Sequence, residues 1–103
     1  MWFYVYVLMN EKQELYIGRT NDLRRRVKAH NQGKSQYTKQ HHWRLVYFEA
    51  FRSSKDAYRR EQKLKQHGQV KRWLKERIAE SLKECAELSA GEALNLSPSK
   101  RRP

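Results

Sequence analysis

The sequence has only one cysteine and lacks a long apolar run, and both features limit the compartments in which the protein can act. Because Cys85 has no second cysteine to pair with, no internal disulfide can form, which suits a reducing compartment such as the cytoplasm. No run approaches the roughly 18 to 20 apolar residues that span a bilayer. The apolar stretch Met1–Met9 also lacks the basic segment and the cleavage site of a signal peptide. We therefore expect a cytoplasmic protein without a membrane segment.

Acidic residues are scarce beside basic ones. The chain has 11 Asp and Glu against 23 Lys and Arg, a formal net charge of +12 at pH 7. Such an imbalance favours polyanionic partners, and nucleic acid fits better than a membrane surface because no membrane segment is evident. With 103 residues, of which 38% are hydrophobic, the chain can form one domain with a small core. A shallow surface site is therefore expected rather than an enclosed one.

Several common chemical motifs are missing. The sequence contains no Walker-type glycine loop, no glycine-rich dinucleotide fingerprint and no internal repeat. His41 and His42 are adjacent, but no Cys or further His stands at ligand spacing, so they make a poor zinc site. Nucleotide-driven and zinc-based chemistry are therefore disfavoured.

Hydrophobic patterning predicts an α+β domain with the element order ββαβαα. Residues 2–8 and 14–19 are rich in aromatic and β-branched residues and predict a hairpin, with a polar turn at residues 10–12. Residues 43–51 predict a third strand, buried on much of both faces. Because no alternating βα crossovers occur, we expect a three-stranded antiparallel sheet flanked by helices.

Three helices are predicted around this sheet. The first should follow a cap at Thr20 or Asn21 and end before Gly33. The second should begin near residue 54 and end near Gly68. The third follows directly and carries apolar residues at helical spacing, with its tryptophan expected in the core: Val70, Trp73, Leu74, Ile78, Leu82 and Cys85.

The domain is expected to span residues 1–88, with its core in about 2–80. From about residue 89 the chain lacks periodicity. Residues 89–103 end in serine, proline, lysine and arginine and are expected to form a disordered basic tail.

The hairpin places two tyrosines on one face. The register that unites the apolar residues of both strands pairs Val5 with Ile17. That register sets Tyr6 opposite Tyr16, beside open space at Gly18. The two phenols can form the floor of a site, or they can be half-buried strand aromatics without a function. The hairpin alone leaves both interpretations open.

The first helix separates its basic residues by face. Arg26 and His30 are four residues apart and therefore neighbours at the margin of the face that docks on the sheet. A functional role fits both residues, and so does simple packing of the Arg26 stem on the core. Arg24, Arg25 and Lys28 point elsewhere and are interpreted as solvated cations that can also contact phosphate.

Glu61 lies between Ala57 and Leu64 on the apolar stripe of the second helix. Carboxylates are rarely buried unless they are paired or coordinate a metal ion. Pairing with Arg19 or Arg26 is one explanation. Ligation of a hard cation is the other, because Mg²⁺ needs only one or two carboxylates beside waters and substrate phosphate.

Together these residues resemble the GIY-YIG nuclease superfamily, particularly its small stand-alone bacterial members and the incision domain of excision-repair nucleases. The resemblance covers roughly residues 2–74. The second signature tripeptide is intact as Tyr16-Ile17-Gly18, whereas the first is Tyr4-Val5-Tyr6, with tyrosine in place of glycine. The further motif residues follow in order: Arg26, His30 and Glu61.

The resemblance implies hydrolysis of DNA phosphodiester bonds with one Mg²⁺ or Mn²⁺ ion and little sequence specificity. Selectivity would come from DNA shape, as in repair or recombination. Either tyrosine can be the general base, with Tyr6 preferred, and nearby Arg19 and Arg26 would lower its pKa from the usual value near 10. The implied catalytic residues are Tyr6, Tyr16, Arg26, His30 and Glu61. Glu61 is also the implied metal ligand. The expected substrate-binding cations are Arg19, Arg24, Arg25, Lys28, Lys34 and Lys39.

The alternative function is a non-catalytic or partner-dependent nucleic-acid-binding module. It would keep the fold and the basic surface without cleaving. RNA stays open as a substrate in place of DNA. Retention of both tyrosines, Arg26 and Glu61 favours the enzyme, because decay would be expected to remove one of them.

Overall fold

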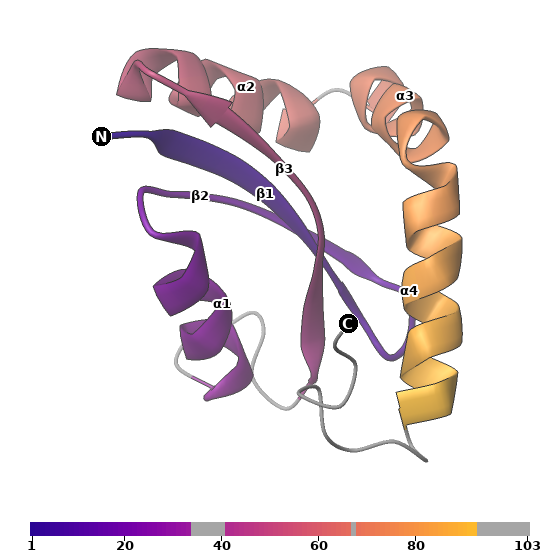
Figure 1. Cartoon of the computed structure of the whole chain (residues 1–103). Coiled ribbons are helices and arrows are strands. Elements are labelled where there is room, and N and C mark those ends of the chain that lie inside the picture. Colours follow the sequence, from indigo (N-terminus) through magenta and orange to yellow (C-terminus); the bar gives the residue numbers. More distant parts are fainter. Residues whose placement is uncertain (34–40, 67, 93–103) are drawn as a thin grey trace.

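A computed structural model describes residues 1–33, 41–66 and 68–92 of the chain (Figure 1). In these residues the chain forms three strands, β1 (Phe3–Asn10), β2 (Leu15–Thr20) and β3 (Trp43–Phe51). It also forms four helices there, α1 (Leu23–Asn31), α2 (Ser54–Gln66), α3 (Gly68–Arg77) and α4 (Ala79–Glu92). The α+β class and the antiparallel sheet are confirmed, and the observed order ββαβααα has one helix more than expected.

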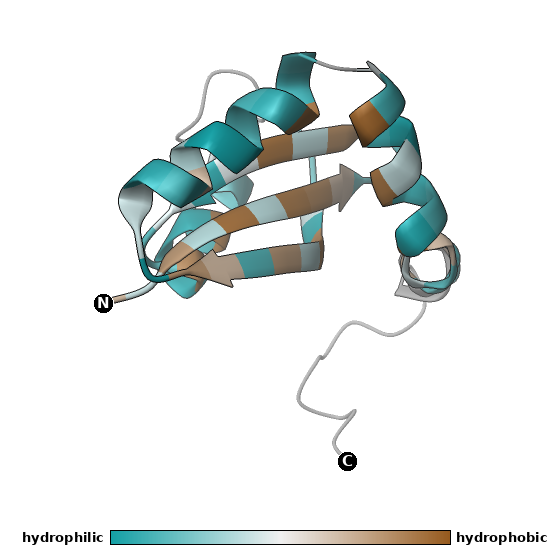
Figure 2. Ribbon diagram, turned by 90° about the horizontal axis from the view of Figure 1, so that it is seen from above, coloured by the Kyte–Doolittle hydropathy of each residue, from teal (hydrophilic) through white to brown (hydrophobic). Residues whose placement is uncertain are grey.

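The sheet separates two layers of helices. Its strand order is β2-β1-β3, and both neighbouring pairs are antiparallel. The helix α1 packs beside one face, whereas α2, α3 and α4 lie on the other (Figure 1). Figure 2 shows hydrophobic residues concentrated in the strands and hydrophilic residues over much of the helix surface. The central strand β1 is thus covered on both sides, and its residues from Val5 to Asn10 are buried.

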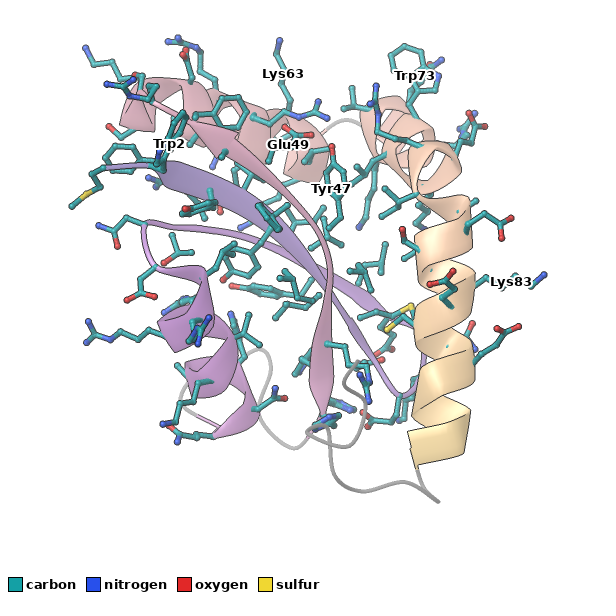
Figure 3. All side chains as sticks on the ribbon, viewed as in Figure 1. Trp2, Tyr47, Glu49, Lys63, Trp73 and Lys83 are labelled. Carbon is teal, nitrogen blue, oxygen red and sulfur yellow. The ribbon has the colours of Figure 1, made fainter. Side chains whose placement is uncertain are left out.

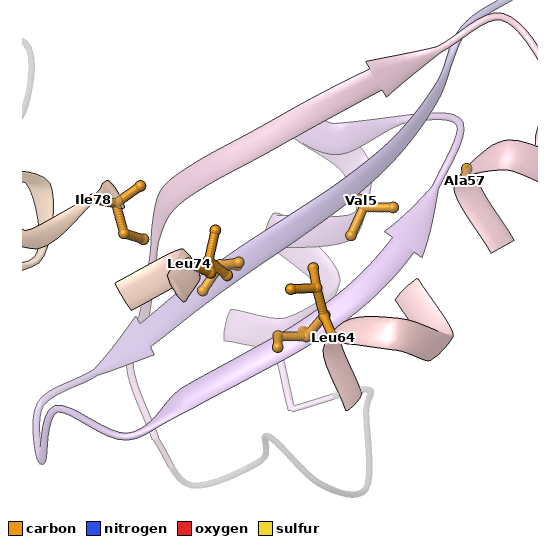
Figure 4. Packing of buried hydrophobic residues seen from close by; sticks show 7 residues of the cluster. Val5, Ala57, Leu64, Leu74 and Ile78 are labelled. Carbon is orange, nitrogen blue, oxygen red and sulfur yellow. The ribbon is translucent and has the colours of Figure 1, made fainter. Parts of the chain in front are cut away.

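The larger core joins the sheet to the layer of α2, α3 and the start of α4 (Figure 4). Val5 and Val7 of β1 pack with Leu64 of α2 and Leu74 of α3. These four side chains are between 0% and 2% exposed. Because Leu64 is one turn away from Glu61, this packing also fixes the position of that carboxylate.

The smaller core lies under α1. Tyr6 and Trp43 are buried there, and Leu23 and Val27 of α1 pack against them. At the end of the helix, the side chain of Asn31 accepts a hydrogen bond from the Trp43 backbone N–H at 2.6 Å. The Asn31 side chain also donates to the Trp43 carbonyl at 2.9 Å, so two hydrogen bonds join the end of α1 to the start of β3.

Both ends of α1 are defined by local chemistry. The helix is capped by Asp22, whose carboxylate accepts a hydrogen bond from the N–H of Arg25 at 3.2 Å. The cap therefore lies later than the expected Thr20 or Asn21. Gly33 follows the helix with a φ of 75°, a left-handed conformation that glycine adopts without strain.

The hairpin register differs from the expected one by two residues. The observed Cα pairs are Val5 with Arg19, Tyr6 with Gly18, Val7 with Ile17 and Leu8 with Tyr16. The expected pairs, Tyr6 with Tyr16 and Val5 with Ile17, are wrong. Since a shift by two residues preserves the alternation of faces, Tyr6 and Tyr16 still lie on one side of the sheet.

A wide turn explains this register. The side-chain oxygen of the buried Asn10 accepts hydrogen bonds from the N–H groups of Lys12 at 2.9 Å and Glu14 at 3.0 Å. Gln13 takes a φ of 65°, which closes the turn. The turn therefore extends to Glu14, beyond the residues 10–12 that were expected, and hairpin register follows turn length.

The third strand is not buried on both faces as expected. Because β3 is an edge of the sheet and α1 reaches only part of it, Phe48 is 49% exposed and Leu45 is 38% exposed. Tyr47 and Glu49 point to the opposite face, toward α2 and α3 (Figure 3). A continuous apolar run therefore does not guarantee burial on two sides.

Two helices, α3 and α4, replace the single third helix that was expected. The chain still makes helical hydrogen bonds across the junction, from Ile78 N–H to the Leu74 carbonyl at 3.1 Å. Trp73, expected in the core, is 57% exposed and lies on the outer side of α3 (Figure 3).

The helix α4 continues to Glu92, past the expected boundary at residue 88. Residues 93–103 of the expected basic tail lie outside the described residues. Within the described ranges, no helix combines the length and the apolar character needed to cross a bilayer.

Truncation of Leu64 should show how strongly the larger core holds the fold. Leu64→Ala is expected to lower the free energy of unfolding by about 2 to 5 kcal/mol, because it leaves a cavity between α2 and β1. The control is Leu45→Ala, the same chemical change at a residue that is 38% exposed. Urea unfolding followed by circular dichroism measures both, and equal losses for the two variants would contradict this assignment of the core.

Candidate active site

A fully buried phenol forms the centre of the site. Tyr6 is 0% exposed, and its hydroxyl oxygen accepts a hydrogen bond from Arg26 Nε at 3.3 Å. The same hydroxyl lies 2.9 Å from Nε2 of His30, which is 1% exposed. Arg26 and His30 are the pair that helical spacing placed on one side of α1, and the structure brings both to the same oxygen.

Donor counting fixes the direction of one of the two hydrogen bonds at the Tyr6 hydroxyl. A guanidinium only donates, so the Tyr6 oxygen is the acceptor toward Arg26. Toward His30 Nε2, the Tyr6 hydroxyl donates when that ring nitrogen is unprotonated and accepts a second hydrogen bond when it carries the proton.

Burial sets the protonation states of both groups. Burial raises the pKa of Tyr6 to about 12, against the lowering effect of its hydrogen bond with Arg26. Burial also lowers the pKa of His30 to about 4, with the positive charge of Arg26 acting in the same direction. The expected lowering of the Tyr6 pKa toward neutrality is therefore not found, because desolvation outweighs the neighbouring arginine.

Tyr16 extends the cluster toward solvent. Its ring centroid lies 4.7 Å from that of His30 and 6.3 Å from that of Tyr6. Unlike Tyr6 it is only half-buried. Its hydrogen bonding and charge contribute to a raised pKa of Arg26, of which the Tyr6 hydrogen bond is the largest cause. The two tyrosines thus share one arginine but differ in their access to water.

Gly18 is required by the position of the Tyr6 ring. A Cβ at residue 18 would overlap the Tyr6 hydroxyl oxygen and lie 2.5 Å from Tyr6 Cζ. It would also lie 3.0 Å from Cε2 of Tyr16. The space at Gly18 that was expected to be open is therefore filled by the Tyr6 phenol, which leans across β2.

The expected metal ligand, Glu61, lies in a second cluster. It is 7% exposed, and Oε1 accepts a hydrogen bond from Arg19 Nε at 3.1 Å. Its other oxygen, Oε2, lies 3.2 Å from Lys65 Nζ. The Arg19 guanidinium also lies over the Tyr58 ring, 5.2 Å from its centroid. Of the two pairings considered, the one with Arg19 is observed.

The two clusters meet at the β2 edge of the sheet. Arg19 is opposite Val5 and points to the α2 side, whereas its neighbour Gly18 is on the Tyr6 side. Glu61 is near enough to Tyr6 for its negative charge to add to the raised pKa of that phenol, although burial is the main cause. The site is therefore formed around a strand edge rather than inside a closed pocket.

The residues present fit a hard divalent cation only in a minimal way. Among the described residues, no group of three or more His, Cys, Asp and Glu could hold a metal ion by itself. One buried carboxylate, Glu61, is available, and flexible cations occupy its oxygens. Mg²⁺ keeps several waters and uses one or two carboxylates with substrate phosphate, so this donor suits an ion that binds together with a phosphate.

Cations on α1 line a groove that has Arg26 in common with the Tyr6 cluster, whereas Tyr6, Tyr16 and His30 do not line it. Arg25, Arg26 and Lys28 contribute to its wall, together with the cap residue Asp22. Arg24 is also exposed on this helix. The expected substrate-binding residues Lys34 and Lys39 lie outside the described residues.

Sequence reasoning missed two residues around Glu61. Lys65 is four positions after Glu61 on α2, so helical spacing alone could have identified this pair. Tyr58 precedes Glu61 by three positions, but its contact is with Arg19 of β2, and no pattern within α2 indicates it.

Comparison with known proteins shows the family of this chain. The model of the GIY-YIG catalytic domain matches residues 2–73. The UPF0213 protein CPE1444 of Clostridium perfringens is 44% identical over 64 residues, which cover 60% of this chain and 69% of the relative. The UPF0213 protein HQ_3675A of Haloquadratum walsbyi is 36% identical over 81 residues, covering 77% and 88% of the two chains.

A solved structure is also similar. The solution NMR structure of the UPF0213 protein BH0048 from Bacillus halodurans is 37% identical, with a TM-score of 0.47. The match covers 72% of this chain and 81% of that one.

The fold and the site define a small α+β domain in which two phenols, an imidazole and a guanidinium share one face of an antiparallel sheet. With the family model matching residues 2–73, the chain belongs to the GIY-YIG family, whose catalytic domain is a nuclease domain.

Substitution of Gly18 should disturb the Tyr6 cluster. Gly18→Ala is expected to lower the free energy of unfolding by about 1 to 3 kcal/mol, because the new methyl group displaces a buried phenol. The matched control is Gly68→Ala at the start of α3, where a Cβ meets nothing within 4 Å. Thermal unfolding measures both, and a Gly18→Ala variant as stable as Gly68→Ala would contradict the close approach.

His30 should make stability depend on pH. Its pKa is lowered from 6.5 to about 4 on folding, so the unfolded chain takes up this proton first as the pH falls. Its contribution is complete above pH 6.5 and decreases toward pH 4, by about 3 kcal/mol. His30→Gln should therefore be destabilising at pH 7, with a difference from the wild type that shrinks toward pH 4.

Urea unfolding at several pH values measures this difference. His42→Gln, a change at an exposed histidine, is the control and should follow the wild-type pH dependence. A constant difference between wild type and His30→Gln from pH 7 to pH 4 would show that His30 is not buried in the neutral form.

Proposed function

We propose that the protein is a divalent-metal-dependent endonuclease that hydrolyses DNA phosphodiester bonds with little sequence specificity. The observation that carries the proposal is the convergence of Tyr6, His30 and Arg26 at one buried hydroxyl, with the buried carboxylate Glu61 on the other side of the β2 edge. Membership of a nuclease family supports it. A cluster with a purely structural role would require neither the partly exposed Tyr16 nor the cation-lined groove to which Arg26 also contributes.

Arg26 is proposed to hold the scissile phosphate. Its Nε is committed to Tyr6, which fixes the plane of the guanidinium. The terminal nitrogens can then donate to two oxygens of one phosphate, a geometry that lysine does not reproduce. The charge that develops on the phosphate in the transition state would be stabilised by this fixed donor.

The two tyrosines are proposed to have different roles. Tyr6 is buried, with a pKa of about 12, and acts by positioning Arg26. Tyr16 is half-buried on the same face and is the phenol placed to meet the attacking water. His30 is hydrogen-bonded to the Tyr6 hydroxyl and keeps the phenol oriented. This division reverses the expectation that Tyr6 is the preferred base.

Glu61 is proposed to hold one Mg²⁺ or Mn²⁺ ion. When bound, the ion would supply Lewis-acid stabilisation of the phosphate and lower the pKa of a water. Arg19 and Lys65 balance the carboxylate charge in the absence of the ion. Both side chains are partly exposed and can turn from the carboxylate to DNA phosphates when the ion binds.

The remaining cations position the DNA without reading its sequence. Arg24, Arg25 and Lys28 are exposed on α1 and can contact backbone phosphates, which carry no sequence information. We propose the same contact with backbone phosphates for Lys34 and Lys39. We also propose that the enzyme selects DNA by its shape, as in repair or recombination. RNA offers the same phosphates and is the substrate to compare.

One observation favours a second function, a nucleic-acid-binding module without cleavage. Both oxygens of Glu61 are occupied by Arg19 and Lys65, as in a purely structural ion pair. Incubation of the protein with supercoiled, nicked and forked DNA and with Mg²⁺ or Mn²⁺ separates the two functions. Binding without any chelator-sensitive cleavage would support the binding module.

The carboxylate of Glu61 provides the sharpest test. Glu61→Gln keeps the shape of the side chain but removes its charge, so cleavage with Mg²⁺ should fall by about a thousandfold or more. DNA binding should be retained or become tighter, because Arg19 and Lys65 are released from the carboxylate. Plasmid nicking and filter binding measure the two effects.

The control for this variant is Glu76→Gln, which removes an exposed carboxylate from α3 and should leave cleavage unchanged. Cleavage by Glu61→Gln at the wild-type rate would remove Glu61 from the mechanism.

A further inference from the structure

Exposed aromatic side chains continue the sheet face that carries Tyr6. Phe48 lies directly opposite Tyr6 in the β1–β3 pairing, in the row next to the candidate active site. It is 49% exposed, although it is a large apolar residue. Tyr4 is half-buried on the same face. Trp2, just before β1, is 48% exposed.

These rings are held in place rather than free. The Phe48 and Tyr4 ring centroids are 5.8 Å apart, with planes at 72°, an edge contact that fixes the orientation of Phe48. The guanidinium of Arg52 lies 5.4 Å from the centre of the Trp2 ring. Figure 3 places Trp2 at the beginning of β1. The exposed rings therefore begin at Phe48, beside the buried Tyr6, and continue toward the N-terminal end of β1.

Cations stand at both ends of this surface. Arg26 is bound to Tyr6 at one end, and Arg52 is stacked on Trp2 at the other. A second copy of so basic a chain would bring like charges together here, whereas a polyanion complements them. Aromatic rings alternating with cations suit single-stranded nucleic acid, whose bases stack on rings while its phosphates pair with the charges.

We propose that Phe48, braced by Tyr4 and continued by Trp2, is a stacking surface for unpaired DNA bases beside the phosphate held at Arg26. An intact duplex keeps its bases stacked on one another and cannot use these rings. The substrate would then be DNA with a single-stranded segment at the cleaved bond. The location of the cleaved bond rests on the proposed nuclease function, but the binding of unpaired bases does not.

Binding to labelled DNA without any divalent cation tests this proposal independently of cleavage. The probes are a fluorescein-labelled oligothymidylate and a duplex of equal length, measured by fluorescence anisotropy. Phe48→Ala should weaken binding of the single strand by about tenfold and leave duplex binding unchanged. Phe48→Trp should restore single-strand binding, because tryptophan also offers a face for stacking.

The matched control is Trp73→Ala, which removes another exposed aromatic residue from the opposite helical layer. It should leave binding of both probes unchanged. Equal weakening of both probes by Phe48→Ala, or no weakening, would overturn the proposal. Self-association that is lost in Phe48→Ala, measured by sedimentation, would assign the surface to a second copy and also overturn it.

Cleavage assays distinguish this inference from the nuclease function. If the wild-type protein binds the single strand through Phe48 but cleaves no DNA, the stacking surface stands and the nuclease function falls. If cleavage depends on Glu61 but Phe48→Ala keeps the same preference between single-stranded and duplex substrates, the nuclease function stands and the stacking surface falls.

Discussion

The arrangement of the site depends on the burial of the Tyr6 hydroxyl. A buried hydroxyl without partners is costly, so both its proton and its lone pairs must be satisfied by the protein. The hydrogen bonds of this hydroxyl with His30 and Arg26 fix the rotation of α1 relative to the sheet. The absence of a side chain at Gly18 gives the phenol its place. One hydroxyl therefore links residues from β1, β2 and α1.

The same burial separates the protonation states of the cluster. Desolvation disfavours phenolate and imidazolium alike, so it raises the pKa of Tyr6 to about 12 and lowers that of His30 to about 4. Both shifts therefore disfavour transfer of the proton from Tyr6 to His30 in the resting protein. The pair holds a neutral hydrogen bond, and its contribution is rigidity rather than a stored charge.

Those parts of the fold and the site that depend on local sequence patterns could be predicted from the sequence. Alternation of apolar residues placed Tyr6 and Tyr16 on one face, and helical spacing placed Arg26 beside His30. The register could not be predicted, because it depends on hydrogen bonds of the Asn10 side chain within the turn. The exposure of Phe48 could not be predicted either, because it depends on how much of the sheet α1 covers, which is a feature of the tertiary structure.

For Glu61, the sequence pattern could predict burial but not the partners of the buried charge. Its place on an apolar stripe indicated burial, which the structure confirms at 7% exposed, but not which group compensates it. An unpaired buried carboxylate would cost several kcal/mol, so the fold must provide a cation whether or not a metal ion binds. Arg19 and Lys65 supply that charge from positions where both can also reach solvent. Because the Arg19 and Lys65 side chains are 38% and 44% exposed, the buried anion is compensated without the burial of either cation.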